Sequence, residues 1–305
     1  MAFQWPTIDQ AAYRVMRLRR LLAVAVSIPL FILLSVSFYD PALLSPSQAS
    51  LATLGLATVI VAHVVLFPNV TVETLALAIS ATGLVLVMPV LQALALWAPA
   101  EQESGALVLL VGFALALTGV LVVLLQIVLG GLFYGGPVVR RVMHLRQRLP
   151  FAAQTAFQQF ALRPSTRRGR ILTGPADENG FFEVVVATTA SDGSPEEVRV
   201  DAKVLDSTDD RHDVMLLSRF GAVTVTSLSF EADADGCILD VRDMPGDFTA
   251  GMYALFWLTD QQADTLTEMA DLLTGRDARA NGLAHHGSLV SAAGMILSPR
   301  APMVD

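Results

Sequence analysis

The segment GGLFYGGPVVRRVMHLRQR, residues 130–148, joins two parts of the chain with different chemistry. It begins at the end of a long apolar run and contains four arginines between residues 140 and 148. Of the 48 charged residues, nine precede Pro137 and 39 follow it. Such segregation predicts that the first part of the chain is solvated by lipid and the second by water.

Four apolar stretches before Pro137 approach or exceed the length of about 20 residues that a helix needs to cross a bilayer. We expect a membrane region over residues 21–136, after an N-terminal segment of residues 1–20. The four predicted spans contain no Asp, Glu, Lys or Arg and cover about residues 21–39, 51–67, 75–97 and 106–134. The polar residues His63, Gln92 and Gln126 are expected to hydrogen-bond across the bundle, since a transporter would be expected to carry a carboxylate inside a span.

The arginines predict the orientation of the chain. RVMRLRR precedes the first span and RRVMHLRQR follows the fourth, while the loops after the first and third spans carry no basic residue. Basic residues favour the cytoplasmic side. We therefore expect an integral protein of the bacterial inner membrane with both termini in the cytoplasm. In an alternative interpretation, the first span is a signal peptide that is cleaved before Phe38.

Composition excludes some partners and cofactors. The net charge is -8, and the part after Pro137 carries 23 acidic and 16 basic residues, which argues against nucleic acid as a partner. The single cysteine, Cys237, cannot form an internal disulfide. The acidic stretch DSTDDRHD, residues 206–213, matches no calcium loop and is interpreted as a turn between strands. We expect no metal and no cofactor.

After residue 141 the hydrophobic period changes from helix to strand. Residues 142–149 alternate, a short amphipathic helix follows in PFAAQTAFQQFAL, and six alternating runs are separated by turn residues. The pattern predicts an antiparallel sheet. A helical period then returns, with Met252, Phe256 and Leu266 on one face, and Gly275 is expected to end this helix.

This order of elements resembles that of the START-like superfamily, also called SRPBCC or helix-grip. The resemblance covers residues 141–275 and is most evident in RRGRILTGPADENGFFEV, residues 167–184, and FWLTDQQADTLTEMADLLTG, residues 256–275. It implies an α+β domain whose curved antiparallel sheet wraps a long C-terminal helix around a cavity for apolar molecules. We expect this domain at 137–275, followed by a tail at 276–305, so that the fold class is a four-helix all-α membrane region plus an α+β helix-grip domain.

The predicted function is binding of a lipid or another hydrophobic small molecule beside the membrane. Met252, Phe256 and Leu266 are expected to line the cavity, and Arg140, Arg141, Arg167 and Arg168 to contact lipid headgroups. The superfamily shares no catalytic set, so no catalytic residue is assigned.

Two alternatives remain open. One is a scaffold that docks a protein partner, including a partner bound through the membrane helices. The other is a cyclase-like enzyme, for which Glu183, His212 and Asp240 are the ionisable residues to inspect.

Overall fold

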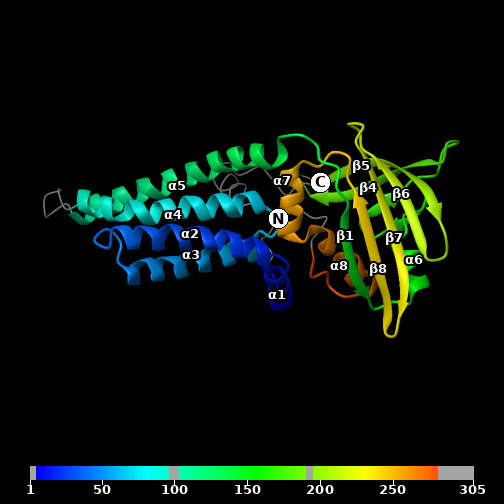
Figure 1. The fold of residues 1–305 in the computed structure, drawn as a ribbon, viewed down its shortest axis with the longest axis horizontal. Helices are drawn as coiled ribbons and strands as arrows, with labels where there is room; N and C mark the ends of the chain where they lie inside the picture. The colour runs from blue at the N-terminus through cyan, green and yellow to red at the C-terminus, as the bar shows by residue number, and fades with distance from the viewer. Residues whose placement is uncertain (1–4, 96–102, 190–194, 281–305) are drawn as a thin grey trace, which may run out of the picture. The chain divides into compact units, whose positions relative to one another are not determined.

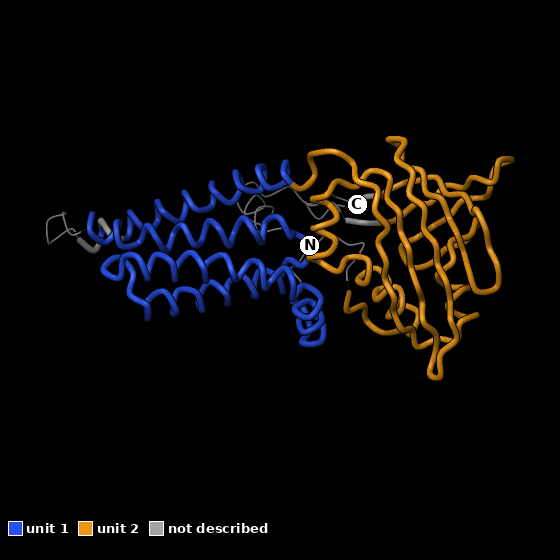
Figure 2. The backbone as a smooth tube through the Cα atoms, viewed as in Figure 1, with its two compact units in different colours: residues 1–132, 288–305 blue, residues 133–287 orange. Residues whose placement is uncertain are grey.

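The computed structural model describes residues 5–95, 103–189 and 195–280. The chain divides between Leu132 and Phe133 into two compact units (Figure 2). The first unit is helical, and the second combines an antiparallel sheet with three helices (Figure 1). The predicted fold class, a helical region followed by an α+β domain, is confirmed.

The first unit consists of one short helix and four long ones. Their bounds are α1 Ile8–Arg17, α2 Arg19–Tyr39, α3 Pro46–Leu66, α4 Thr71–Ala95 and α5 Glu103–Tyr134. Within the described residues, α2 to α5 are the helices long and apolar enough to cross a membrane. Helix α1 lies in a segment for which the sequence analysis predicted no element. It begins with a capping box, in which Thr7 and Gln10 satisfy each other's backbone N–H groups.

Helices α2, α3 and α4 form the packed part of the bundle. One of its buried apolar clusters consists of Leu33, Leu44 and Ala49, near the turn between α2 and α3. Helix α5 is packed less closely: only 11% of its most apolar segment is buried, compared with 28–39% of the corresponding segments of the other three long helices. Most of the α5 surface therefore faces outward, as expected of a helix solvated by lipid.

The second unit contains one antiparallel sheet of eight strands in the order β1-β8-β7-β6-β5-β4-β3-β2. The strands are β1 Met143–Leu149, β2 Arg167–Arg168, β3 Ile171–Thr173, β4 Phe181–Thr189, β5 Pro195–Ser207, β6 Arg211–Leu217, β7 Val223–Asp233 and β8 Gly236–Met244. Helix α6, Ala153–Phe160, follows β1, and helices α7, Ala250–Thr259, and α8, Gln261–Leu273, follow β8. Strands β1 and β2 are the two edges of the sheet.

The predicted closing helix is divided in two. Asp260, at φ 46° and ψ 37°, adopts the left-handed conformation and separates α7 from α8. The prediction that Met252, Phe256 and Leu266 share one continuous helical face is therefore wrong. Aspartate tolerates this conformation better than most residues, and the helical period runs through it without a glycine or proline to mark the break.

One face of the sheet, here called the inner face, packs against α6 and α8. Its main hydrophobic cluster joins Leu149 of β1, Phe230 of β7 and Leu239 of β8 to Phe157 of α6, with Leu266 of α8 packed against it. A second cluster covers the other half of the same face and consists of Phe182, Val184, Ala202 and Val214. The opposite face, here called the outer face, carries the charged residues that alternate with these positions.

Candidate functional site

Helix α8 reaches both ends of the sheet across the inner face. At the β1 end, the Gln147 amide donates to Thr267 Oγ1 at 3.2 Å. At the β2–β3 end, Arg170 Nε lies 3.1 Å from Glu268 Oε1. A single helix thus contacts both edges of a sheet that curves around it (Figure 1).

The middle strands are less completely covered. On β5 and β6, Val200, Val204 and Leu216 point to the inner face and pack against the second hydrophobic cluster, but all three are only half-buried. Thr224 and Thr226, the partners of Leu216 and Val214 on β7, are also half-buried. Solvent therefore reaches apolar side chains on the face that α6 and α8 cover, which is the surface that an apolar ligand would need.

Asp243 is the carboxylate that lies on this inner face beside α8. It continues the alternation of Cys237, Leu239 and Val241 along β8, and it accepts a hydrogen bond from the side-chain amide of Gln262. Burial raises the pKa of Asp243, while hydrogen bonds from Thr226 and Gln262 oppose that shift. Asp243 was not among the predicted site residues, although the alternation in CILDVRDM, residues 237–244, places it on the same side of the strand as Leu239.

The three residues predicted to line a cavity lie in different surroundings. Leu266 packs against the main hydrophobic cluster of the inner face. Phe256 lies on α7 with its ring 4.7 Å from that of Phe248, and Met252, half-buried, is at the start of the same helix, where its N–H is capped by Thr249. Only Leu266 is therefore in contact with the inner-face cluster.

Two of the three residues inspected for an enzymatic role lie on the outer face. Glu183 is exposed there and lies 3.4 Å from Arg199. Asp240 lies 2.7 Å from His144, and this hydrogen bond is the main cause of its lowered pKa. Both carboxylates thus take part in polar contacts between neighbouring strands on the outer face.

His212 points to the inner face but is closed off. It is 1% exposed, its Nε2 lies 2.8 Å from the carbonyl of Leu162, and its Nδ1 lies 3.1 Å from Ser207 Oγ. A carbonyl can only accept, so Nε2 carries the proton and Nδ1 accepts from the serine hydroxyl. Both ring nitrogens are engaged, and the side chain fixes α6 to β6 through Leu162 and an edge contact with Phe157.

His212 predicts a loss of stability in mild acid. Burial lowers its pKa, so the unfolded chain binds a proton at this position before the folded domain does. The contribution of neutral His212 to the free energy of unfolding is therefore complete above about pH 6.5 and decreases as the pH falls below that value. We expect the thermal midpoint of the wild type to decrease between pH 8 and 5.5 more than that of His212→Gln, which keeps a donor for Leu162. Equal decreases in the two proteins would contradict the assignment.

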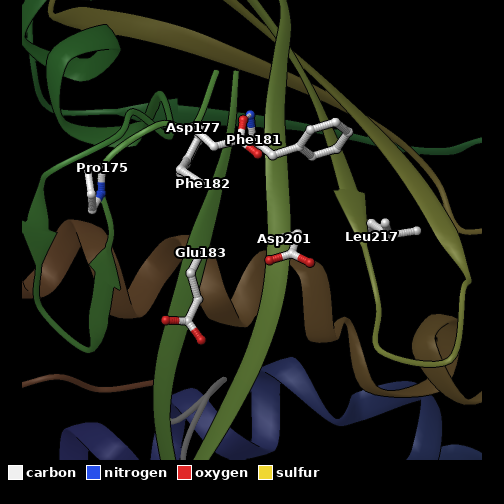
Figure 3. Close-up of a pocket in the computed structure, with 7 residues that line it drawn as sticks. All are labelled: Pro175, Asp177, Phe181, Phe182, Glu183, Asp201 and Leu217. Carbon is white, nitrogen blue, oxygen red and sulfur yellow. Dashed lines mark hydrogen bonds between the residues drawn. The ribbon is translucent and has the colours of Figure 1, made fainter. Parts of the chain in front are cut away.

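The outer face carries an open groove of about 410 Å³. Its lining is Pro175, Asp177, Phe181, Phe182, Glu183, Asp201 and Leu217, and Figure 3 shows the carboxylates of Glu183 and Asp201 on adjacent strands. Asp177 accepts from the backbone N–H groups of Asn179 and Phe181 and so shapes the loop at its rim. Three carboxylates make this groove a poorer place for an apolar molecule than the inner face.

Of the four arginines predicted to contact lipid headgroups, three are exposed and one binds the domain itself. Arg140, Arg141 and Arg167 are exposed. The guanidinium of Arg168 donates to the carbonyls of Gln159 and Ala161 at the end of α6, so it binds the domain itself. Contact of the exposed arginines with lipid stays a prediction.

A buried polar network joins three of the long helices in the first unit. His63 Nε2 of α3 lies 2.9 Å from Glu73 Oε1 of α4, and the Gln126 amide of α5 donates to Glu73 Oε2 at 3.1 Å. Thr74 Oγ1 lies 3.2 Å from His63 Nδ1. The network fits the expected role of His63 and Gln126 in cross-bundle hydrogen bonding, and it adds Glu73, which is 3% exposed, as its centre.

Comparisons with known proteins give structural likenesses only. No family model matches the chain, and no curated protein matches it. A protein from Mesorhizobium loti is 11% identical with a TM-score of 0.32 over 45% of this chain and 99% of that one, and a Staphylococcus epidermidis protein is 11% identical with a TM-score of 0.34 over 46% and 93%. The di-domain ARO/CYC StfQ from the steffimycin biosynthetic pathway is 11% identical with a TM-score of 0.31 over 58% and 61%. Values this low carry no argument about ligand or activity.

Proposed function

We propose that the chain is a membrane-anchored protein whose second unit binds a lipid or another hydrophobic small molecule on the inner face of its sheet, at the cytoplasmic side of the bacterial inner membrane. The observation that supports this most directly is the half-buried state of Val200, Val204 and Leu216, which lie on the same face that α6 and α8 cover at β1, β7 and β8. An apolar ligand there would remove that surface from water, which contributes about 25 cal/mol per Å². The membrane-spanning helices would keep the site beside the bilayer in which such a ligand is dissolved.

The position of Asp243 suggests that the ligand carries a polar group. The carboxyl group of Asp243 accepts hydrogen bonds, and the side chains of Gln262 and Thr226 beside it can both donate and accept them. The proposed ligand is therefore an apolar molecule with one hydroxyl or carbonyl group. Catalysis on that molecule is a second candidate function, since Asp243 is an ionisable group at the same face.

The test is mass spectrometry of small molecules released from a fragment that begins at Phe133. Starting there retains the hydrogen bond from Thr249 Oγ1 to the Phe133 carbonyl, at 2.6 Å, which ties α7 to the entering chain. We expect a bound apolar molecule in the wild type. Leu216→Trp should abolish its occupancy, because the indole would occupy the inner face between β5 and β7.

Leu217→Trp is the matched control. Leu217 is the next residue on the same strand, is half-buried as well, and lines the outer groove. Occupancy retained in Leu217→Trp and lost in Leu216→Trp would support the inner face. The reverse result would assign binding to the outer groove, and a folded wild-type fragment without any ligand would favour the scaffold alternative.

A further inference from the structure

Helix α1 has its polarity reversed relative to a helix on the surface of a water-soluble protein. Its side chains Arg14 and Arg17 are each 6% exposed, while Ile8 is 88% and Met16 is 64% exposed. Ile8, Ala12 and Met16 follow one another at intervals of four residues and form a single exposed stripe. The two buried arginines lie on the opposite side of the helix, since a residue turns by about 100° along an α-helix.

The buried arginines bind the turn between α3 and α4. Arg14 Nη1 donates to the Val65 carbonyl at 2.5 Å, and both terminal nitrogens of Arg17 lie 3.4 Å from Asn69 Oδ1. Val65 belongs to the last turn of α3, where carbonyl groups lack helical partners and a cation is favourable. The arginines therefore have a specific structural reason to face the bundle, which fixes the opposite, apolar stripe outward.

Helix α1 is also placed where a bilayer surface would be. A single residue, Leu18, separates it from α2, the first helix long enough to span. Figure 1 shows α1 crosswise to α2, so that α1 lies along the membrane plane when α2 lies along the normal. Helix α2 likewise presents apolar side chains outward, among them Phe31, which is 69% exposed.

We propose that α1 is an interfacial helix whose stripe Ile8, Ala12 and Met16 inserts among the lipid acyl chains beside the first span. This inference rests on the proposed membrane location of the bundle. In this environment acyl chains solvate the apolar stripe, while the arginines bind the bundle and its polar turn. Both sets of side chains are therefore in favourable surroundings. In water, by contrast, the apolar side chains of Ile8, Ala12 and Met16 would be exposed to solvent.

The experiment is spin labelling of the full chain in vesicles of phosphatidylcholine and phosphatidylglycerol. Cysteine is introduced singly at Ile8, Ala12 and Met16, and at Asp209, which is exposed in the turn between β5 and β6 and serves as the water-facing control. The wild type is the labelling blank, because Cys237 is fully buried. Collision with oxygen, which concentrates in lipid, is compared with collision with a water-soluble nickel chelate.

We expect collisions with oxygen to exceed those with nickel at the three stripe positions, and collisions with nickel to exceed those with oxygen at Asp209→Cys. Phe31→Cys on α2 tests the membrane location of the bundle separately from the position of α1. Lipid-type collisions at residue 31 with water-type collisions at the stripe would overturn the interfacial assignment alone, whereas water-type collisions at residue 31 would refute the membrane location itself. Spin–spin broadening at the stripe that disappears on dilution with unlabelled protein would show that a second copy of the chain covers it, and would also overturn the proposal.

Discussion

Replacing Leu239 with alanine is expected to destabilise the second unit by about 2–5 kcal/mol. Leu239 is 0% exposed and lies in the main hydrophobic cluster, where β8 meets α6 and the face covered by α8. Truncation removes buried methyl groups and leaves a cavity that close-packed neighbours fill only in part. The same loss would reduce the support for α8 and so for the proposed binding face.

Hydrogen exchange of the full chain, measured by mass spectrometry, tests this expectation. The amides of β8 should exchange roughly 30 to 5,000 times faster in Leu239→Ala, if they exchange by opening of the whole unit. Leu172→Ala is the control, since it makes the same chemical change at a β3 side chain that is 51% exposed. Unchanged exchange in Leu239→Ala, or an equal effect in Leu172→Ala, would contradict the described core.

Replacing Glu73 with alanine is expected to destabilise the helical unit by about 3–5 kcal/mol. The carboxylate contacts His63 of α3 and Gln126 of α5, and its removal would leave these polar groups without that partner among apolar helices. Glu73→Gln should cost less than half as much. A glutamine at this position offers an oxygen to one neighbour and an N–H to the other.

Hydrogen exchange again provides the measurement, in detergent micelles. Peptides from α3 and α4 should exchange faster in Glu73→Ala, while peptides from β8 serve as an internal control that should not change. In the double variant Glu73→Ala, His63→Ala, the loss of unfolding free energy should be smaller than the sum of the losses in the two single variants, because the two residues share one interaction. Strict additivity would show that His63 and Glu73 act independently.

The sequence predicted much of this structure because its signals are local. Uninterrupted apolar runs indicated four long helices, and period-two alternation with polar turns indicated the antiparallel sheet. The division of the closing helix at Asp260 was missed, since the helical period continues through it. Helix α1 was missed as well, because its arginines were read as an orientation signal while its apolar residues are too few for a span.

The candidate site depended on facts that no single segment contains. Alternation shows that Leu216 and Leu217 point to opposite faces of the sheet, as do Phe182 and Glu183. It does not show which of the two faces is the inner one. Helices α6 and α8 decide this, by covering the face that carries Leu239 and Val214. Asp243 became a candidate, and Asp240 ceased to be one, for this reason.

The sequence by itself determined the two-part organisation, the fold class and the alternation of each strand, because these follow from hydrophobic period and charge along the chain. Only the tertiary structure decided that Glu73 centres a buried network with His63 and Gln126, that Arg14 and Arg17 face the bundle, and that Asp243 faces α8. These pairs are 10 or more residues apart, and up to 53 in the case of Glu73 and Gln126. Their burial depends on which surfaces meet when the helices and the sheet pack, and that is set by the whole fold.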